Sequence, residues 1–254
     1  MVHGTGKADR LITNSGAHPS RGRTSWTSKP EREDYAAFVG FFVNYLSALT
    51  HPPRGQDQAH APGSIDLVLG GYSYGSLILS SLPALPEILR RFDSSAEGSA
   101  AIKIIKTASD LATETRKRLE KREMSEVTLP FSGQTSQPED RFPHVSVRYL
   151  LVSPLLPPVS RLLSLSLSSP FSSSHSMAAL EGSTLASNPT LAVFGSDDIF
   201  TSASKLRTWA SKMEAAGKRR FEWLEVDGAS HFWRERGVED ELRAKIATWL
   251  VDEE

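Results

Sequence analysis

Four short apolar segments, separated by helix-like stretches, constrain most strongly what this chain can fold into. They are rich in Ile, Leu, Val and aromatic residues and lie at 64–71, 145–152, 190–195 and 220–226. Short apolar runs of this kind suit buried parallel strands, and the last alternates enough to lie near a sheet edge. The spacing of apolar residues predicts helices over 34–48 and 238–250. The sequence therefore predicts an α/β fold, with a mainly parallel sheet flanked by helices.

Two stretches interrupt this alternation. Residues 100–124 are a long, highly charged helix candidate followed by a polar loop, so we expect an inserted charged helix within a charged insertion over 100–143. Residues 160–176 are rich in serine and are compatible with a mobile lid, an edge strand or a linker. We therefore expect a Ser-rich lid or loop region over 154–188, an irregular segment over 1–20, and a single domain over 1–254.

The composition excludes several classes of protein. The chain has 254 residues, of which 39% are hydrophobic and 23% charged, close to globular averages. Its formal net charge of −1 provides no long-range field to gather nucleic acid or an anionic membrane. The absence of cysteine excludes disulfides, thiolate metal sites and a cysteine nucleophile. Because no apolar run has the length of a signal-peptide core or a membrane span, we expect a cytoplasmic protein without a transmembrane segment.

The first apolar segment runs directly into Gly71-Tyr72-Ser73-Tyr74-Gly75, a G-x-S-x-G pattern. In a nucleophile elbow the serine lies on a strained turn, and the residues two before and two after it must be small because neighbouring chain approaches closely. The residues from Ser76 onward can be helical, so the pattern stands between a predicted strand and a predicted helix. The alternative interpretation is a glycine-rich turn without a catalytic role.

An acid and a histidine follow downstream, as a serine nucleophile requires. Asp197 and Asp198 come after the third apolar segment, and His231 comes after the fourth. Because the carboxyl ends of parallel strands meet at one edge of a sheet, we expect these side chains to converge with Ser73. Each also has a structural interpretation, since one of the two aspartates can cap a helix or shape a turn and loop histidines are common.

Several motifs together resemble the α/β-hydrolase family. They are G-Y-S-Y-G-S, G-S-D-D-I-F-T and G-A-S-H-F-W, with S-R-G-R-T-S-W near Ser20 and S-P-L-L-P-P from Ser153. The resemblance extends from about Ser20 to the end of the chain and is to uncharacterised serine-hydrolase-like proteins of fungi. It implies an α/β-hydrolase-like sheet and acyl-transfer chemistry.

The resemblance also assigns roles to individual residues. Ser73 would be the nucleophile and His231 the general base. The family spacing G-x-x-D, counted from Gly195, selects Asp198 over Asp197 as the acid that orients the imidazole. The backbone N–H of Tyr74 would supply half of the oxyanion hole.

The chain departs from the family pattern upstream of residue 34. In the family, two strands, a helix and the second oxyanion donor precede this point, whereas only 33 residues stand here, with at most one short strand at 11–13. His3-Gly4 imitates the His-Gly of an oxyanion loop. The other interpretation, which we favour, is a chain that lacks the first strands of the family.

The sequence contains no phosphate-binding loop, zinc-protease helix or dinucleotide-binding fingerprint. We therefore expect a serine hydrolase that cleaves a small-molecule ester, thioester or amide through an acyl-enzyme, with no cofactor, no metal and no nucleic-acid partner. Acyl transfer to another acceptor remains open, and the sequence predicts no oligomeric state. The competing hypothesis is a truncated or non-catalytic homologue that acts as a binding module.

Overall fold

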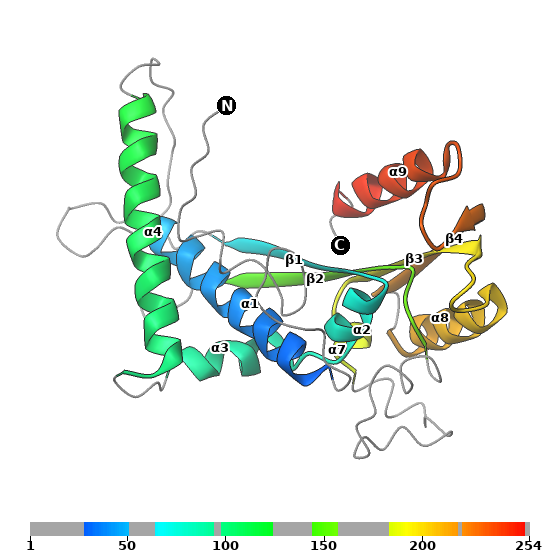
Figure 1. Ribbon diagram of the computed structural model, residues 1–254, viewed down its shortest axis with the longest axis horizontal. Helices are drawn as coiled ribbons and strands as arrows, with labels where there is room; N and C mark the ends of the chain where they lie inside the picture. The colour runs from blue at the N-terminus through cyan, green and yellow to red at the C-terminus, as the bar shows by residue number, and fades with distance from the viewer. Residues whose placement is uncertain are drawn as a thin grey trace. The chain divides into compact units, whose positions relative to one another are not determined.

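The computed structural model describes residues 28–50, 64–93, 98–123, 144–156, 183–217 and 220–251 (Figure 1). In chain order its elements are α1 (Lys29–Thr50), β1 (Ile65–Tyr72), α2 (Tyr74–Ser80), α3 (Leu85–Asp93), α4 (Ala100–Glu123), β2 (Val145–Val152), α7 (Thr184–Ser187), β3 (Thr190–Asp197), α8 (Ala203–Gly217), β4 (Phe221–Ser230) and α9 (Val238–Val251). Residues 1–20, the loop that follows α4 up to 143 and the serine-rich segment 160–176 lie outside the described residues, so the expectations placed on them stay predictions.

The four strands form one parallel sheet in the order β1-β2-β3-β4, with helices flanking it. Residues 149–152 of β2 pair with 190–193 of β3, and β3 pairs with β4 from Thr190 opposite Phe221 onward. Because all four strands are parallel, their carboxyl ends lie at one edge of the sheet. The α/β class expected from the sequence is therefore present, and the loops that follow the strands gather where ligands bind in such sheets.

The described residues cluster into two compact units. One contains the residues up to Tyr35 together with Val68–Pro83 and Val147–Glu254, and we call it the strand-end unit. The other, the α4 unit, contains Ala36–Leu67 and Ala84–Ser146. Since α1, β1 and β2 each contribute residues to both units, the expected single domain stays a prediction.

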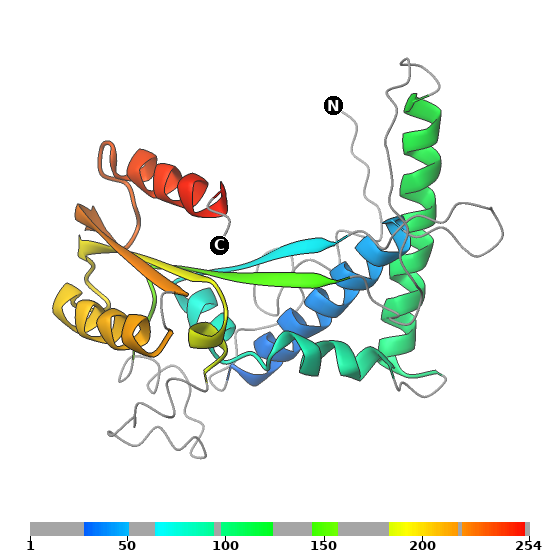
Figure 2. The ribbon, with the colours of Figure 1, turned by 180° about the vertical axis from the view of Figure 1, so that it is seen from behind.

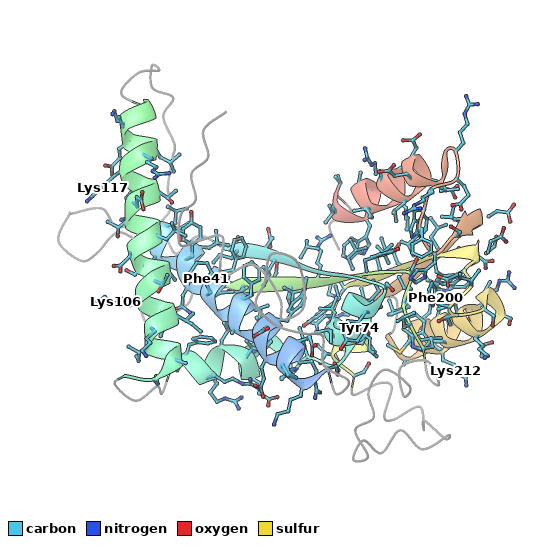
Figure 3. All side chains as sticks on the ribbon, in the orientation of Figure 1. Phe41, Tyr74, Lys106, Lys117, Phe200 and Lys212 are labelled. Atoms are coloured by element: carbon cyan, nitrogen blue, oxygen red, sulfur yellow. The ribbon has the colours of Figure 1, made fainter. Side chains whose placement is uncertain are left out.

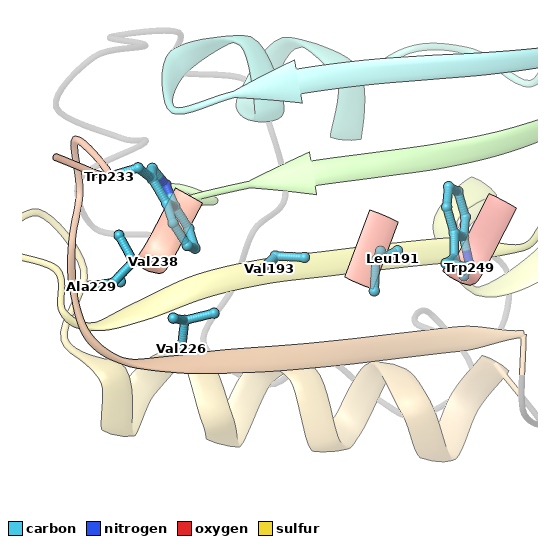
Figure 4. Close-up of a cluster of buried hydrophobic side chains, with 7 residues drawn as sticks. All are labelled: Leu191, Val193, Val226, Ala229, Trp233, Val238 and Trp249. Carbon is cyan, nitrogen blue, oxygen red and sulfur yellow. The ribbon is translucent and has the colours of Figure 1, made fainter. Parts of the chain in front are cut away.

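Helices cover both faces of β3 and β4 in the strand-end unit. Helices α8 and α9 lie on opposite sides of these strands in both views of the ribbon (Figures 1 and 2). On the α9 side, alternate strand residues form a buried apolar cluster with the helix (Figure 4), made of Leu191, Val193, Val226, Ala229, Trp233, Val238 and Trp249. On the other side, Phe194 stacks on Trp223, and Trp209 of α8 meets Phe221 edge to face. Burial on both faces explains why β3 reads as a continuous apolar run.

The α4 unit is held together differently. Gly40 of α1 is needed for close packing, because a Cβ there would lie 2.0 Å from the Phe92 ring of α3. Over residues 100–121 of α4, where burial is described, the fully buried side chains are the small ones of Ala108 and Ala112. The Tyr45 hydroxyl of α1 donates to Thr115 at 3.2 Å. The charged helix predicted over 100–124 is therefore present, and polar contacts join it to its neighbour.

Two element boundaries differ from the sequence-based expectation by four residues or more. Helix α1 begins at Lys29 rather than at Asp34, because Pro30 falls in the first helical turn, where a missing N–H costs nothing. Strand β4 continues to Ser230 rather than ending at Val226. An irregularity in the register between Gly195 and Asp197, where Asp197 pairs with Ser230, lets the chain extend as a strand through Gly228.

Candidate active site

Ser73 lies alone between the end of β1 and the start of α2. Its backbone has φ 52° and ψ −117°, a conformation that costs free energy for a residue with a side chain. The surroundings hold this turn on both sides. The Ser73 N–H donates to the Val152 carbonyl at 2.9 Å, and the Ser76 hydroxyl donates to the Ser73 carbonyl at 2.6 Å. The turn therefore has the strained strand-to-helix geometry expected of a nucleophile elbow.

The two glycines of the pattern are not equivalent. A Cβ on Gly71 would lie 2.5 Å from the Gly75 carbonyl oxygen, so only glycine fits there. A Cβ on Gly75 would have no neighbouring atom within 4 Å. The expectation that both flanking positions must be small is therefore confirmed for Gly71. It is wrong for Gly75, where a side-chain Cβ would have space.

The three residues selected from the sequence meet at this turn. The distance from His231 Nε2 to Ser73 Oγ is 2.7 Å, and the distance from His231 Nδ1 to Asp198 Oδ2 is also 2.7 Å. The side chains of His231 and Asp198 are buried. One ring nitrogen can thus accept the serine proton while the other donates to the carboxylate, the arrangement of a catalytic triad.

The structure separates the two candidate acids. Asp198 follows β3 directly, and its second oxygen, Oδ1, accepts the backbone N–H groups of Phe200 and Thr201 at 2.8 and 3.1 Å. These bonds fix the carboxylate in one rotamer with Oδ2 toward His231. Asp197 is the last residue of β3 and is exposed, and its carboxylate accepts from the Ser196 hydroxyl at 3.2 Å. Of the two aspartates, Asp198 is therefore the one whose carboxylate contacts the imidazole, and its role as the acid stays a proposal.

Tyr74, selected as an oxyanion donor, is the first residue of α2 and follows Ser73 directly. Its side chain lies on that helix (Figure 3), and burial raises the pKa of its hydroxyl. Its backbone N–H occupies the sequence position that an elbow uses to bind a developing oxyanion. His3-Gly4, the other candidate for this function, lies outside the described residues.

Exposed apolar side chains lie beside the triad residues in sequence, and three of their rings lie close to the His231 ring. Each is adjacent in sequence to a triad residue or one further along, and each is at least 45% exposed: Tyr72 46%, Ile199 78%, Phe200 45% and Phe232 50%. The ring centroids of Tyr72, Phe200 and Phe232 lie 5.5, 4.4 and 5.4 Å from that of His231. We call these four residues the apolar collar. Exposed apolar surface concentrated in this way indicates a ligand or partner surface.

Comparison with protein-family models, with curated proteins and with solved structures finds no match for this chain. The function therefore has to be argued from the geometry of the site. Within the residues that the structure describes, His, Asp and Glu side chains form no group of three or more that could hold a metal ion. None of the helices in this part of the chain combines the length and apolar content needed to cross a bilayer.

Sequence reasoning missed the groups that hold the His231 main chain. Tyr72 occupies a variable position of the G-x-S-x-G pattern, yet its hydroxyl donates to the His231 carbonyl at 2.9 Å. Ser153 and Trp233 complete this arrangement. A polar residue next to the nucleophile was the available signal, but the partner is a backbone atom 159 positions away, which no side-chain pattern shows.

Proposed function

We propose that this protein is a serine hydrolase that cleaves an acyl compound through a covalent acyl-enzyme on Ser73. The observation that carries the proposal is the pair of 2.7 Å contacts that His231 makes with Ser73 Oγ and Asp198 Oδ2. Neither contact alone would distinguish this site from ordinary packing. Together with the strained backbone of Ser73, they match the requirements for an activated nucleophile.

The reaction follows from the atoms in place. Ser73 Oγ attacks the substrate carbonyl carbon and passes its proton to His231 Nε2, while Asp198 stays ionised and stabilises the imidazolium. The carbonyl oxygen becomes an oxyanion, for which the Tyr74 N–H is the proposed donor. His231 then gives the proton to the leaving alcohol, thiol or amine as its bond to carbon breaks. Water repeats these steps, releasing a carboxylic acid and restoring Ser73.

The apolar collar favours a substrate with apolar groups beside the scissile bond. Phe200 and Phe232 follow the acid and the base in sequence, and their rings lie 6.1 Å apart. An apolar acyl chain or an aromatic leaving group could cover these rings and remove them from water. Hydrolysis and transfer of the acyl group to another small acceptor use the same first step. No cofactor takes part in the proposed reaction, and a cytoplasmic location stays a prediction.

The proposal is tested by hydrolysis of p-nitrophenyl acetate by wild-type protein and by Ser73→Ala. An acyl-enzyme predicts an initial burst of p-nitrophenol close to one equivalent per chain, followed by slower turnover. In Ser73→Ala the burst should vanish and the steady rate should fall by a factor on the order of 10⁴. Ser81→Ala is the matched control, because this exposed hydroxyl donates to carbonyls of the preceding helix α2, at Leu77 and Ile78.

A burst that survives in Ser73→Ala would remove Ser73 from the reaction. Absence of turnover in a folded wild-type protein, with this ester and with longer-chain esters, would favour the binding-module hypothesis. The thermal midpoint of Ser73→Ala should stay close to that of wild type, since a hydroxyl that is not fully buried contributes little to packing.

A further inference from the structure

The carbonyl oxygen of His231 accepts hydrogen bonds from two strand ends. Tyr72, the last residue of β1, donates from its hydroxyl at 2.9 Å. Ser153, directly after β2, donates from its hydroxyl at the longer distance of 3.4 Å. The indole N–H of Trp233 in turn donates to Ser153 Oγ at 2.9 Å. The main chain of the histidine is thus tied to two strands that are not neighbours of β4 in the sheet.

Two of the residues that make these bonds are held in uncommon backbone conformations. Ser153 has φ 47° and Trp233 has φ 54°, both in the region that favours glycine. Both residues are buried, and the Ser153 N–H donates to the Val193 carbonyl at 2.8 Å. Trp233 also belongs to the apolar cluster beneath α9. Strained conformations persist where the surroundings hold them in place, and they gather at functional sites.

Tyr72 differs from these two because it is about half exposed and is bonded covalently to Ser73. A tyrosine retained only for packing would bury its ring, whereas here the hydroxyl reaches back to the loop that carries the base. One residue therefore connects the nucleophile turn with the main chain of His231. Burial and the Asp198 charge raise the pKa of Tyr72, against a smaller opposing effect of Arg234, so the hydroxyl keeps the proton that it donates.

We propose that Tyr72 is a positioning residue: with Ser153 and Trp233, its hydroxyl fixes the His231 main chain so that Nε2 stays within hydrogen-bond distance of Ser73 Oγ. This inference rests on the proposed hydrolase function and adds a residue to it. The ring of His231 has its own partners on both nitrogens, but these restrain the side chain only if its Cα is fixed. Small displacements of a catalytic group have large effects on rate, because the reacting atoms must meet in one geometry.

The direct test is Tyr72→Phe, which keeps the ring of the apolar collar and removes only the donor. The rate constant for labelling by an alkyl fluorophosphonate and kcat for p-nitrophenyl acetate should each fall about tenfold. KM should change less than about twofold, since the ring that faces the substrate remains. Tyr45→Phe is the control, because it removes a tyrosine hydroxyl that bonds to Thr115 in the α4 unit. Labelling of Tyr72→Phe at the wild-type rate would overturn the inference.

A second variant separates positioning from general loss of stability. Ser153→Gly removes the other donor and suits the positive φ of this position, but it also takes away the partner of the buried Trp233 N–H, so a urea titration must first show that the variant is folded. Because its bond is longer, we expect a decrease in kcat of about threefold. Two donors on one carbonyl can substitute for each other, so Tyr72→Phe combined with Ser153→Gly should lose more than the product of the single effects. If the loss of kcat in the double variant equals the product of the two single losses, the inference that both donors restrain the same carbonyl is wrong.

A spectroscopic measurement distinguishes this inference from the hydrolase proposal. The measurement is the low-field proton resonance of the His231 Nδ1–H in the protein without substrate, since this resonance reports on the hydrogen bond to Asp198. We expect this resonance to shift or broaden in Tyr72→Phe and to be unchanged in Tyr45→Phe. An unchanged resonance in Tyr72→Phe refutes the positioning role, whether or not the wild type hydrolyses esters. Absence of Ser73 labelling in the wild type refutes the hydrolase instead.

Discussion

Polar side chains are buried and hydrogen-bonded in the loops at the carboxyl ends of β1, β3 and β4, whereas those of helix α4 are mostly exposed. In the loops, Asp198 and His231 are buried and each polar atom of the triad has a partner at 2.7–3.1 Å. Helix α4 is 24 residues long, but among those of its residues whose burial is described only Ala108 and Ala112 are completely buried. Its charged side chains, such as Lys106 and Lys117, extend outward from the helix (Figure 3).

The difference indicates in which of the two regions a substitution should have the larger effect. A buried polar group whose partner is removed keeps its desolvation cost, so a change in the strand-end loops has a large effect. An exposed charged helix face is solvated in the folded and unfolded states alike, so a change there has a small effect. The proposed chemistry therefore depends on the loops, and the exposed face of α4 should tolerate substitution.

The largest effect is expected from replacing the acid. Asp198→Asn keeps the shape of the side chain but cannot stabilise the imidazolium, and kcat/KM for p-nitrophenyl acetate should fall by a factor on the order of 10⁴. Asp197→Asn is the matched control, since this exposed carboxylate bonds to Ser196 and does not reach the imidazole. It should lower kcat/KM by less than about tenfold. The opposite ranking would assign the acid role to Asp197.

The next effect concerns the close approach of β3 to β4 beneath the site. A Cβ on Gly195 would lie 1.9 Å from the Ala229 carbonyl oxygen, so Gly195→Ala must displace β3 and the end of β4, which precedes His231, away from each other. We expect the free energy of unfolding, measured by urea titration, to fall by about 3 kcal/mol. Gly70→Ala is the control, because no atom lies within 4 Å of a Cβ there. Equal loss of stability in both variants would contradict the packing described here.

A smaller effect, on the free energy of unfolding, is expected from removing the hydroxyl of either of two tyrosines in the strand-end unit. Burial raises the pKa of both Tyr35 and Tyr149 from 10.0 to about 12. The folded state thus binds each phenol proton more tightly than the unfolded state. The resulting stabilisation is complete below pH 10 and is lost as the pH rises from 10 to about 12, and removing either hydroxyl should flatten this decrease.

At pH 7 the two substitutions should have opposite signs. The Tyr149 hydroxyl is buried and has no hydrogen-bond partner among the residues that the structure describes, so Tyr149→Phe should raise the free energy of unfolding by about 1 kcal/mol. The Tyr35 hydroxyl donates to the Gly70 carbonyl at 3.0 Å, so Tyr35→Phe should lower it by about 1 kcal/mol. Urea titrations at pH 7 and pH 11 measure both effects. Destabilisation by Tyr149→Phe at pH 7 would show that its hydroxyl has a partner.

The smallest effect is expected on α4. Arg118 pairs with Glu114 one turn earlier, and both side chains are exposed. Arg118→Ala should change the free energy of unfolding by less than about 0.5 kcal/mol and leave ester hydrolysis unchanged. A loss of hydrolysis in this variant would end the comparison, because it would show that α4 takes part in the reaction.

The parts of the site that could be predicted from the sequence are those whose chemistry requires particular residues at strand ends. Ser73, Asp198 and His231 follow three apolar segments, and parallel topology brings such positions to one edge. The G-x-x-D spacing that the family resemblance implies also points to Asp198 rather than Asp197, and in the structure β3 ends at Asp197. The broad class of fold could also be predicted, because the spacing of apolar residues along the chain depends on which faces of the helices and strands are buried.

What could not be predicted depends on contacts with main-chain atoms. The bond from Tyr72 to the His231 carbonyl leaves no trace at position 231, because every residue carries a carbonyl. The extension of β4 to Ser230 depends on an irregular register beside Gly195, and Asp227-Gly228 reads as an ordinary turn in the sequence. The two compact units could not be inferred either, since α1, β1 and β2 are continuous in sequence across them.

The claim that Ser73 is an activated nucleophile is tested most directly by mass spectrometry after exposure to an alkyl fluorophosphonate. The account predicts one adduct for each folded chain, located by peptide mapping at Ser73, and much slower labelling in Asp198→Asn. Two other serines at the strand ends, Ser153 and Ser196, should remain unmodified, since the hydroxyl of each bonds to groups other than His231 Nε2. A folded chain that acquires no adduct, or an adduct on Ser196 with Ser73 unmodified, would contradict it.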